Sequence, residues 1–153
     1  MRYRKVCTVM ENLVKTEWKG YTRYDFTVNG YYGIIVEPKK AVPHRPWVWR
    51  AEFFDVFSNA DMEMLAQGWH LAYYQICDMY GCPKAVELME GFHKAVVKEF
   101  KLYNKADIFG FSRGGLYTVN FAAANPDKTS SIYLDAAVLD INTWPGGENK
   151  KVF

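Results

Sequence analysis

The sequence predicts an α/β fold in which a mostly parallel sheet carries helices on both faces and opens with a β-hairpin. Three observations lead to this prediction. Asn29-Gly30 is a two-residue hairpin turn between two apolar runs. Short apolar runs after it alternate with helical patterns, and a glycine-containing turn at residues 110–115 joins one of these runs directly to a helix.

The first elements follow from local patterns of polarity and turn residues. Residues 26–28 and 31–36 are the two arms of the hairpin, whereas the residues before Gly20 show no clear period. Residues 37–46 hold three prolines and are predicted to be a loop. A short strand at residues 47–49 follows this loop.

Two helices are predicted around the next strand. Residues 58–61 begin with a capping serine and end in an acid, as helix starts do, and Gly68 ends this short helix. Residues 71–76 form a compact apolar strand. Pro83 then opens the clearest helix of the chain. Its apolar residues recur at three- and four-residue steps: Ala85, Val86, Met89, Phe92, Val96, Val97 and Phe100.

The last predicted elements are two strands and the helix between them. Residues 107–109 form a buried strand, a helix covers residues 113–124, and Asn125-Pro126 ends that helix. Residues 132–134 are predicted to be a further core strand. No strand pattern follows them, so this strand is expected to leave an uncovered sheet edge that invites self-association.

Composition narrows the classes of protein and partner. Of the 153 residues, 50% are apolar, which is enough for the core of one domain. The net charge is +2 and the basic residues are scattered, which argues against a nucleic-acid partner. No apolar run approaches the roughly 20 residues of a membrane span, and Met1 to Lys5 lead into no apolar leader.

The cysteines favour a reduced, cytoplasmic setting. Cys7, Cys77 and Cys82 are an odd number in a chain that is neither small nor rich in loops, so a disulfide framework is not expected. Cys77 and Cys82 lack the paired spacing and nearby histidines of a zinc site. They are interpreted as buried thiols, and neither a metal nor a cofactor is implied.

The pattern that carries chemistry is Gly110-Phe111-Ser112-Arg113-Gly114, a G-x-S-x-G turn between an apolar strand and a helix. This is the setting of a nucleophile elbow, in which a strained turn exposes the serine hydroxyl. Gly110 and Gly114 allow close approach, and Gly115 lets the helix pack on the sheet. The alternatives are a helix-capping serine or a phosphate cradle, but the P-loop Lys-Ser/Thr ending and the third glycine of a dinucleotide fingerprint are absent.

With this elbow, the preceding strand and the helix that ends at Asn125, the chain resembles the α/β-hydrolase superfamily, in particular its esterase- and lipase-like branch. The resemblance implies that residues 1–153 are a single, incomplete α/β-hydrolase domain, truncated after about the sixth strand. It implies Ser112 as nucleophile and the backbone N–H of Arg113 as one oxyanion donor. The second donor is expected among residues 51–53, where Arg50-Ala51 replaces the family's His-Gly pair, and is assigned to Glu52.

The rest of the catalytic machinery is not evident. The family order is serine, acid, histidine, yet every histidine precedes Ser112. These histidines, expected at the surface or its boundary, are His44, His70 and His93. Asp135 and Asp140 are the candidates for the acid, although both fit loop carboxylates or helix caps at least as well. Asp78 is expected to fix its own loop.

Two classes of function remain open. The first is a serine hydrolase that cleaves small carboxylic esters, with its base histidine outside this chain; a peptidase or thioesterase is the nearest variant, and the chain alone is expected to be inactive. The second is a non-catalytic relative that binds a ligand or protein through an aromatic edge. That edge would comprise Trp47, Trp49, Phe53, Phe54 and Tyr80.

Overall fold

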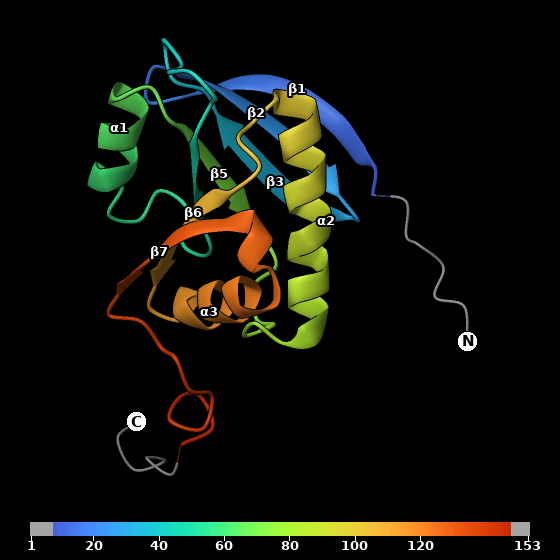
Figure 1. Cartoon of the computed structure of the whole chain (residues 1–153), viewed down its shortest axis with the longest axis vertical. Helices are drawn as coiled ribbons and strands as arrows, with labels where there is room; N and C mark the ends of the chain where they lie inside the picture. The colour runs from blue at the N-terminus through green and yellow to red at the C-terminus, as the bar shows by residue number, and fades with distance from the viewer. Residues whose placement is uncertain (1–7, 148–153) are drawn as a thin grey trace.

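A computed structural model describes residues 8–147 and shows one seven-stranded sheet with three α-helices in that range (Figure 1). The strand order is β1-β2-β3-β5-β4-β6-β7. The strands are β1 (Met10–Trp18), β2 (Tyr21–Val28), β3 (Tyr31–Val36), β4 (Trp47–Arg50), β5 (His70–Tyr74), β6 (Ala106–Phe111) and β7 (Thr129–Asp135). The helices are α1 (Asn59–Ala66), α2 (Pro83–Phe100), α3 (Gly114–Ala124) and the 3-10 turn η1 (Pro126–Lys128).

One half of the sheet is antiparallel. The hairpin predicted around Asn29-Gly30 is confirmed, with Val28 paired to Tyr31 across the turn. β3 then pairs antiparallel with β5. β1, which extends this half, was not predicted, because only Trp18 of its nine residues is buried and no apolar alternation marks the rest.

The other half of the sheet is parallel and contains β5, β4, β6 and β7. The predicted strands and helices of this half are confirmed, but β5 begins one residue earlier than expected, at His70, and ends at Tyr74. In a parallel sheet all carboxyl ends lie at one edge. The loops after β4, β5 and β6 therefore meet at that edge.

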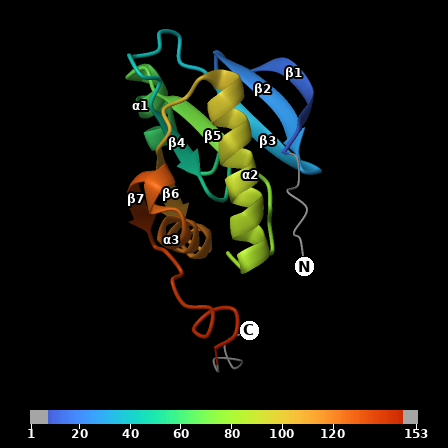
Figure 2. The ribbon, with the colours of Figure 1, turned by 45° about the vertical axis from the view of Figure 1, so that its right-hand side comes forward.

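Helices cover both faces, as predicted (Figure 2). On one face α2 and α3 pack against the larger apolar cluster, which includes Trp49, Phe92 and Phe121. On the other face α1 contributes Leu65 to a smaller cluster with Leu71. The first face thus holds most of the core, and α3 rests on it directly after the β6 turn.

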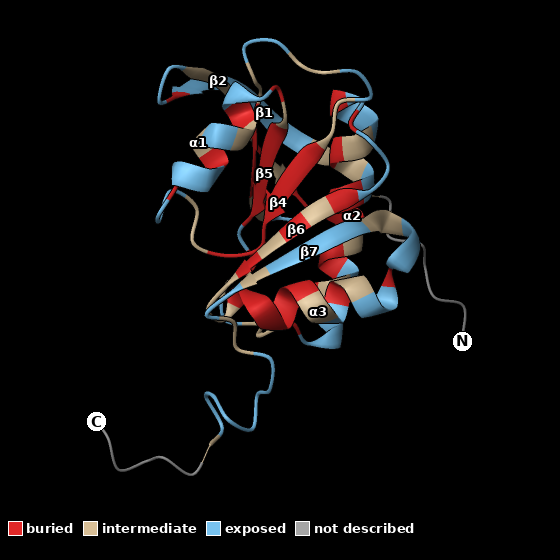
Figure 3. Ribbon diagram, turned by 60° about the vertical axis from the view of Figure 1, so that its left-hand side comes forward, coloured by how far each residue is buried: buried red, intermediate tan, exposed pale blue. Residues whose placement is uncertain are grey.

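The last strand differs from its prediction. Residues 132–134 were expected to form a core strand, yet Ile132 and Tyr133 are 42% and 61% exposed. β7 is the edge strand of the parallel half and is mostly exposed along its length, whereas β4 and β5 are buried (Figure 3). The expectation of an uncovered edge at this strand therefore holds for the described residues, while its assignment to the core was wrong.

Two smaller expectations also change. Ser58 precedes α1 as predicted, but its side chain makes no capping hydrogen bond. Its hydroxyl instead accepts a bond from Lys19 Nζ at 2.6 Å and donates one to Asp55 at 3.2 Å. Of the cysteines expected to be buried, Cys77 is half-buried and Cys82 is exposed; Cys7 lies outside the described residues.

Candidate functional site

The polar residues that the sequence singled out converge at the carboxyl ends of the parallel strands. Ser112 directly follows β6, Glu52 follows β4 by two residues, and Asp78 lies in the loop after β5. Asp135 is the last residue of β7 and pairs with Phe111, the last residue of the neighbouring strand β6. The sheet topology therefore brings together residues that are as much as 83 positions apart in the chain.

Ser112 has the backbone conformation of an elbow residue. Its φ angle is 50°, in the left-handed region that residues other than glycine rarely adopt. Three backbone bonds hold it there: its N–H donates to Asp135 O at 3.0 Å, and its carbonyl accepts from Gly115 N at 3.0 Å and Val138 N at 2.8 Å. Within residues 8–147 the side-chain hydroxyl of this half-buried serine has no hydrogen-bond partner.

Side chains would collide with their surroundings at two of the three glycines around Ser112 and fit tightly at the third. A Cβ atom on Gly110 would come within 2.7 Å of Thr118 Oγ1, which lies on α3. One on Gly115 would approach Val138 O to 2.6 Å, so Gly115 makes room for the segment after β7 rather than for the sheet. At Gly114 the nearest atom would be Glu52 Cβ at 3.3 Å, which shows how closely the loop after β4 packs on the elbow.

Two backbone N–H groups beside the elbow are free. Neither Glu52 N nor Arg113 N donates a hydrogen bond within the described residues, whereas Ala51 N, just before Glu52, donates to Phe109 O, and Gly115 N, two residues after Arg113, donates to Ser112 O. Glu52 N would lie 3.5 Å from a Cβ atom on Gly114, which places it next to the start of α3. Free donors at a helix N-terminus attract negative charge.

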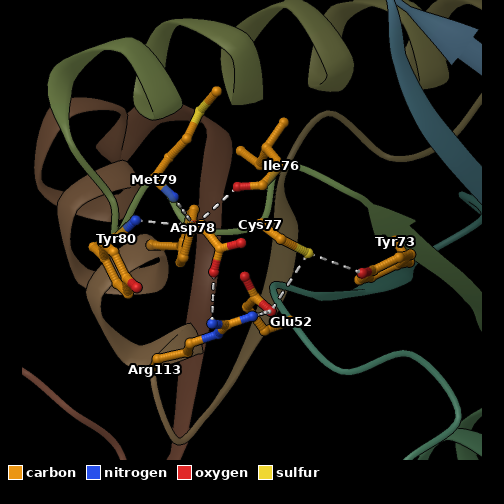
Figure 4. A network of polar contacts seen from close by, with 9 residues as sticks. Glu52, Tyr73, Ile76, Cys77, Asp78, Met79, Tyr80 and Arg113 are labelled. Atoms are coloured by element: carbon orange, nitrogen blue, oxygen red, sulfur yellow. Dashed lines mark hydrogen bonds and ion pairs between the residues drawn. The ribbon is translucent and has the colours of Figure 1, made fainter. Parts of the chain in front are cut away.

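An ionic network surrounds these groups (Figure 4). The Arg113 guanidinium contacts the Asp78 carboxylate at 2.9 Å and the Glu52 carboxylate at 3.3 Å. Burial raises the pKa of Glu52, and the charge of Arg113 opposes that shift. Burial lowers the pKa of Arg113, but attraction to Glu52 and Asp78 outweighs it, so the pKa lies above its ordinary value. Cys77 Sγ lies 3.9 Å from Glu52 Oε2.

Tyr117, which the sequence did not single out, fixes the loop after β5. Its hydroxyl accepts bonds from Met79 N and Tyr80 N and donates one to Ile76 O, each at 2.9 Å. Burial raises the pKa of Tyr117 to about 12, so the hydroxyl keeps its proton. Asp78, expected to fix its own loop, instead reaches Arg113, and Tyr117 of α3 holds the loop.

A buried ion pair fixes the loop after β4. Arg50 Nε lies 2.9 Å from Asp61 Oδ2, with side chains that are 1% and 2% exposed. Arg50 Nη1 also donates to Phe53 O at 3.2 Å, and its guanidinium stacks over the Phe109 ring. The pair thus ties α1 to the segment that carries Glu52. An arginine inside an apolar strand was the only sequence signal for it.

The histidines lie away from Ser112, but two of the three are not at the surface as expected. His70 pairs with Trp47 at the amino ends of β5 and β4, opposite the edge that carries Ser112. His93 packs in α2 against Trp47, and its Nε2 contacts Asn104 O at 2.9 Å. Burial lowers the pKa of both to about 4, which keeps them neutral. His44 is exposed.

The two candidate acids occupy different surroundings. Asp140 accepts bonds from the backbone and side-chain nitrogens of Asn142 at 2.8 and 2.9 Å, within its own turn. The backbone carbonyl of Asp135 accepts a hydrogen bond from Ser112 N, while the exposed Asp135 side chain lies on the α1 face of the sheet. Of the aromatic edge suggested as a binding platform, Trp47 and Trp49 are core residues, 0% and 1% exposed, while Phe53, Phe54 and Tyr80 are half-buried.

The described residues contain neither a candidate metal cluster nor a candidate membrane-spanning helix. Between residues 8 and 147, no three His, Cys, Asp or Glu side chains are grouped so that they could hold a metal ion. Within the same range, no helix has the length and apolar character needed to cross a bilayer.

Several solved structures with a similar arrangement of strands and helices are hydrolases. Cfl2 from Burkholderia cenocepacia is 12% identical with a TM-score of 0.57, over 83% of this chain and 45% of its own. A cold-adapted esterase from an Arctic intertidal metagenome is 10% identical with a TM-score of 0.59, over 88% and 65%. Juvenile hormone epoxide hydrolase from the silkworm Bombyx mori is 12% identical with a TM-score of 0.52, over 76% and 35%.

The chain spans less than half the length of Cfl2 and of the silkworm enzyme. No protein-family model and no curated protein matches the sequence. The strand order, the parallel half with its turn from β6 into α3, and these structural neighbours agree on one architecture. The chain has the α/β-hydrolase fold.

Proposed function

We propose that this chain supplies the nucleophile and the oxyanion hole of a serine hydrolase that cleaves carboxylic esters. The observation that carries the proposal is the position of two free N–H groups, those of Glu52 and Arg113, beside a strained serine whose hydroxyl is also free. The esterase among the structural neighbours supports the substrate class.

In the proposed reaction, Ser112 Oγ attacks the ester carbonyl and its proton passes to a general base. The carbonyl oxygen becomes an anion that the N–H groups of Arg113 and Glu52 stabilise. Collapse of this intermediate breaks the bond to the alcohol, which leaves with a proton, and water then releases the acyl group from Ser112. Each oxyanion donor of this kind contributes about 10²–10³ in rate in characterised serine hydrolases.

The general base is proposed to come from outside these 153 residues. His70 and His93 lie in the core with a pKa of about 4, and both lie near Trp47 at the amino end of β4. Without a base the serine hydroxyl is a weak nucleophile. We therefore expect the isolated chain to react slowly with a fluorophosphonate probe.

An external base provides the test. The rate of fluorophosphonate labelling is measured by mass spectrometry while the imidazole concentration is increased, for the wild type and for two serine variants. Labelling of Ser112 is expected to accelerate with imidazole, to vanish in Ser112→Ala and to persist in the exposed control Ser130→Ala. Labelling that survives Ser112→Ala would contradict the proposal. Brisk Ser112 labelling without imidazole would place a base inside the chain.

In a longer protein that carries the base, the same substitution has a second readout. Hydrolysis of short acyl esters is expected to fall by at least about 10³ in Ser112→Ala, because the covalent route is lost. An unchanged rate would mean that the hydrolysis does not use Ser112.

A further inference from the structure

Glu52 and Arg113, whose backbone N–H groups are both free, also contact each other through their side chains (Figure 4). The two residues are 61 positions apart, and Arg113 Nη2 lies 3.3 Å from Glu52 Oε2. The Glu52 side chain is 3% exposed and that of Arg113 is 22% exposed. One ion pair therefore joins the two segments that carry the free donors.

Side chains provide this link because the backbone does not. Within the described residues, no backbone hydrogen bond joins positions 52–53 to positions 112–115. The Arg113 guanidinium also lies over the Phe53 ring, 5.3 Å from its centroid. Phe53 has a φ of 58°, a conformation that persists only where the surroundings hold it. Arg113 thus contacts two consecutive residues of the loop after β4.

The charges of this network do not explain its position beside the elbow. It holds two carboxyl groups, those of Glu52 and Asp78, and a single guanidinium. An oxyanion would gain nothing from an excess of acidic groups nearby. Stability is not a sufficient reason either, since desolvation offsets much of the attraction in a buried ion pair. The pair does fix geometry, and two donors stabilise one oxyanion only when both reach the same point.

We propose that the ion pair between the side chains of Glu52 and Arg113 positions the two oxyanion donors relative to each other; this rests on the proposed function, because it concerns the same two N–H groups. Each side chain holds the segment that carries the other donor, so separation of the segments would break the pair. Asp78 binds the other terminal nitrogen of the guanidinium at 2.9 Å and so fixes its orientation.

The rate of Ser112 labelling by a fluorophosphonate, at a fixed imidazole concentration, tests this role. Substitution of the side chains leaves both backbone donors in the chain, so a change in rate reports their placement. Glu52→Gln and Arg113→Gln are each expected to slow labelling at least about tenfold, because a misplacement of about 1 Å costs up to about 10² in rate. The maximal rate should fall, while the probe concentration that gives half of it stays unchanged.

A double-mutant cycle separates the ion pair from its two members. Glu52→Gln combined with Arg113→Gln is expected to slow labelling no more than either substitution alone. Glu90→Gln is the matched control and should leave the rate unchanged, since its partner Lys128 is 19% exposed, close to the 22% of Arg113. Circular dichroism establishes that each variant is folded. Because Arg113 is partly exposed, Arg113→Gln provides the test even where Glu52→Gln unfolds.

The direction of the change distinguishes positioning from a direct effect of charge. If charge alone acted, Glu52→Gln would leave the Arg113 charge less compensated and would speed labelling. Unchanged or faster labelling in Glu52→Gln would overturn the positioning role and leave Ser112 as the labelled nucleophile. Effects that multiply in the double variant would overturn it too, because the two side chains would then act separately. A wild type that imidazole does not activate would overturn the proposed function, and the positioning role with it.

Discussion

The two ends of the parallel strands differ in what they present to a ligand. At the carboxyl ends lie charged loops, with positive φ angles at Phe53, Asp78 and Ser112. At the amino ends lie His70 and Trp47, which are 1% and 0% exposed. The same sheet therefore has one end that carries the proposed site, here called the reactive end, and one closed end.

The two ends are distinguished by position along the strands rather than by the chemical types of their residues. Histidine is the usual general base, yet His70 lies at the closed end, and neither of its ring nitrogens has a partner in residues 8–147. Backbone N–H groups carry no chemistry of their own, yet those of Glu52 and Arg113 are free at the reactive end. Three experiments can break or sharpen this contrast.

The largest effect is expected from the ion pair that anchors the reactive end. Asp61→Leu removes the carboxylate that balances the buried Arg50 charge, so the free energy of unfolding should fall by about 3–5 kcal/mol in urea titrations. Glu87→Gln, which removes the exposed pair with Lys84, is the control and should change it by less than about 1 kcal/mol. Equal effects of the two variants would mean that Arg50 is satisfied without Asp61.

The closed end is tested by pH. His70 and His93 have a pKa of about 4 in the folded chain, against 6.5 when unfolded. Between these values the unfolded chain binds more protons, so stability falls as the pH drops from 6.5 to 4, by about 3 kcal/mol for each histidine. Glu52 and Asp61, whose pKa is raised, act in the opposite direction.

Two histidine variants separate the contribution of His70 to the pH dependence of stability from that of the other groups. His70→Phe should remove about half of the histidine-dependent fall in unfolding free energy between pH 7 and 4.5, measured by urea titration, because His93 still contributes. The exposed His44 offers the control, and His44→Asn should leave the slope unchanged. A wild-type slope retained in His70→Phe would mean that this histidine is protonated in the core.

The smallest effect is expected at the loop after β5. Tyr117→Phe removes the acceptor for Met79 N and Tyr80 N, so stability should fall by about 1–3 kcal/mol, measured by thermal and urea unfolding. Tyr103→Phe, at a half-exposed side chain, should stay within about 0.5 kcal/mol. A loss in Tyr117→Phe no greater than that of the control would show that water replaces the hydroxyl.

The sequence predicted the parts of the fold in which pattern and burial agree. The hairpin, α2 and the turn from β6 into α3 follow from local rules and appear where they were expected. β1 was missed because its side chains face solvent and carry no period. β7 was assigned to the core because Ile132 and its apolar neighbours have the composition of a buried strand. Local composition does not determine which strand lies at the edge of a sheet.

The candidate site could be predicted in the same limited sense. A glycine-framed serine between strand and helix is a local signal, so the sharp turn at Ser112 could be predicted from the sequence alone, and its role as nucleophile stays a prediction. Tyr117 and the Arg50–Asp61 pair act across the chain, through contacts between residues 11 to 41 positions apart. Their partners are set by the order of strands in the sheet, which no local pattern contains. Their site roles, like that of Ser112, remain predictions for experiment.

The Arg50–Asp61 pair has a practical meaning for protein engineering. Asp61 belongs to α1, on the face of the sheet opposite α3. Arg50 donates a hydrogen bond to the carbonyl of Phe53, the residue after Glu52. A designer who repacks α1 to improve solubility would therefore also shift the Glu52 N–H, without altering any residue near Ser112. Libraries that aim to keep the elbow intact should hold position 61 constant along with position 112.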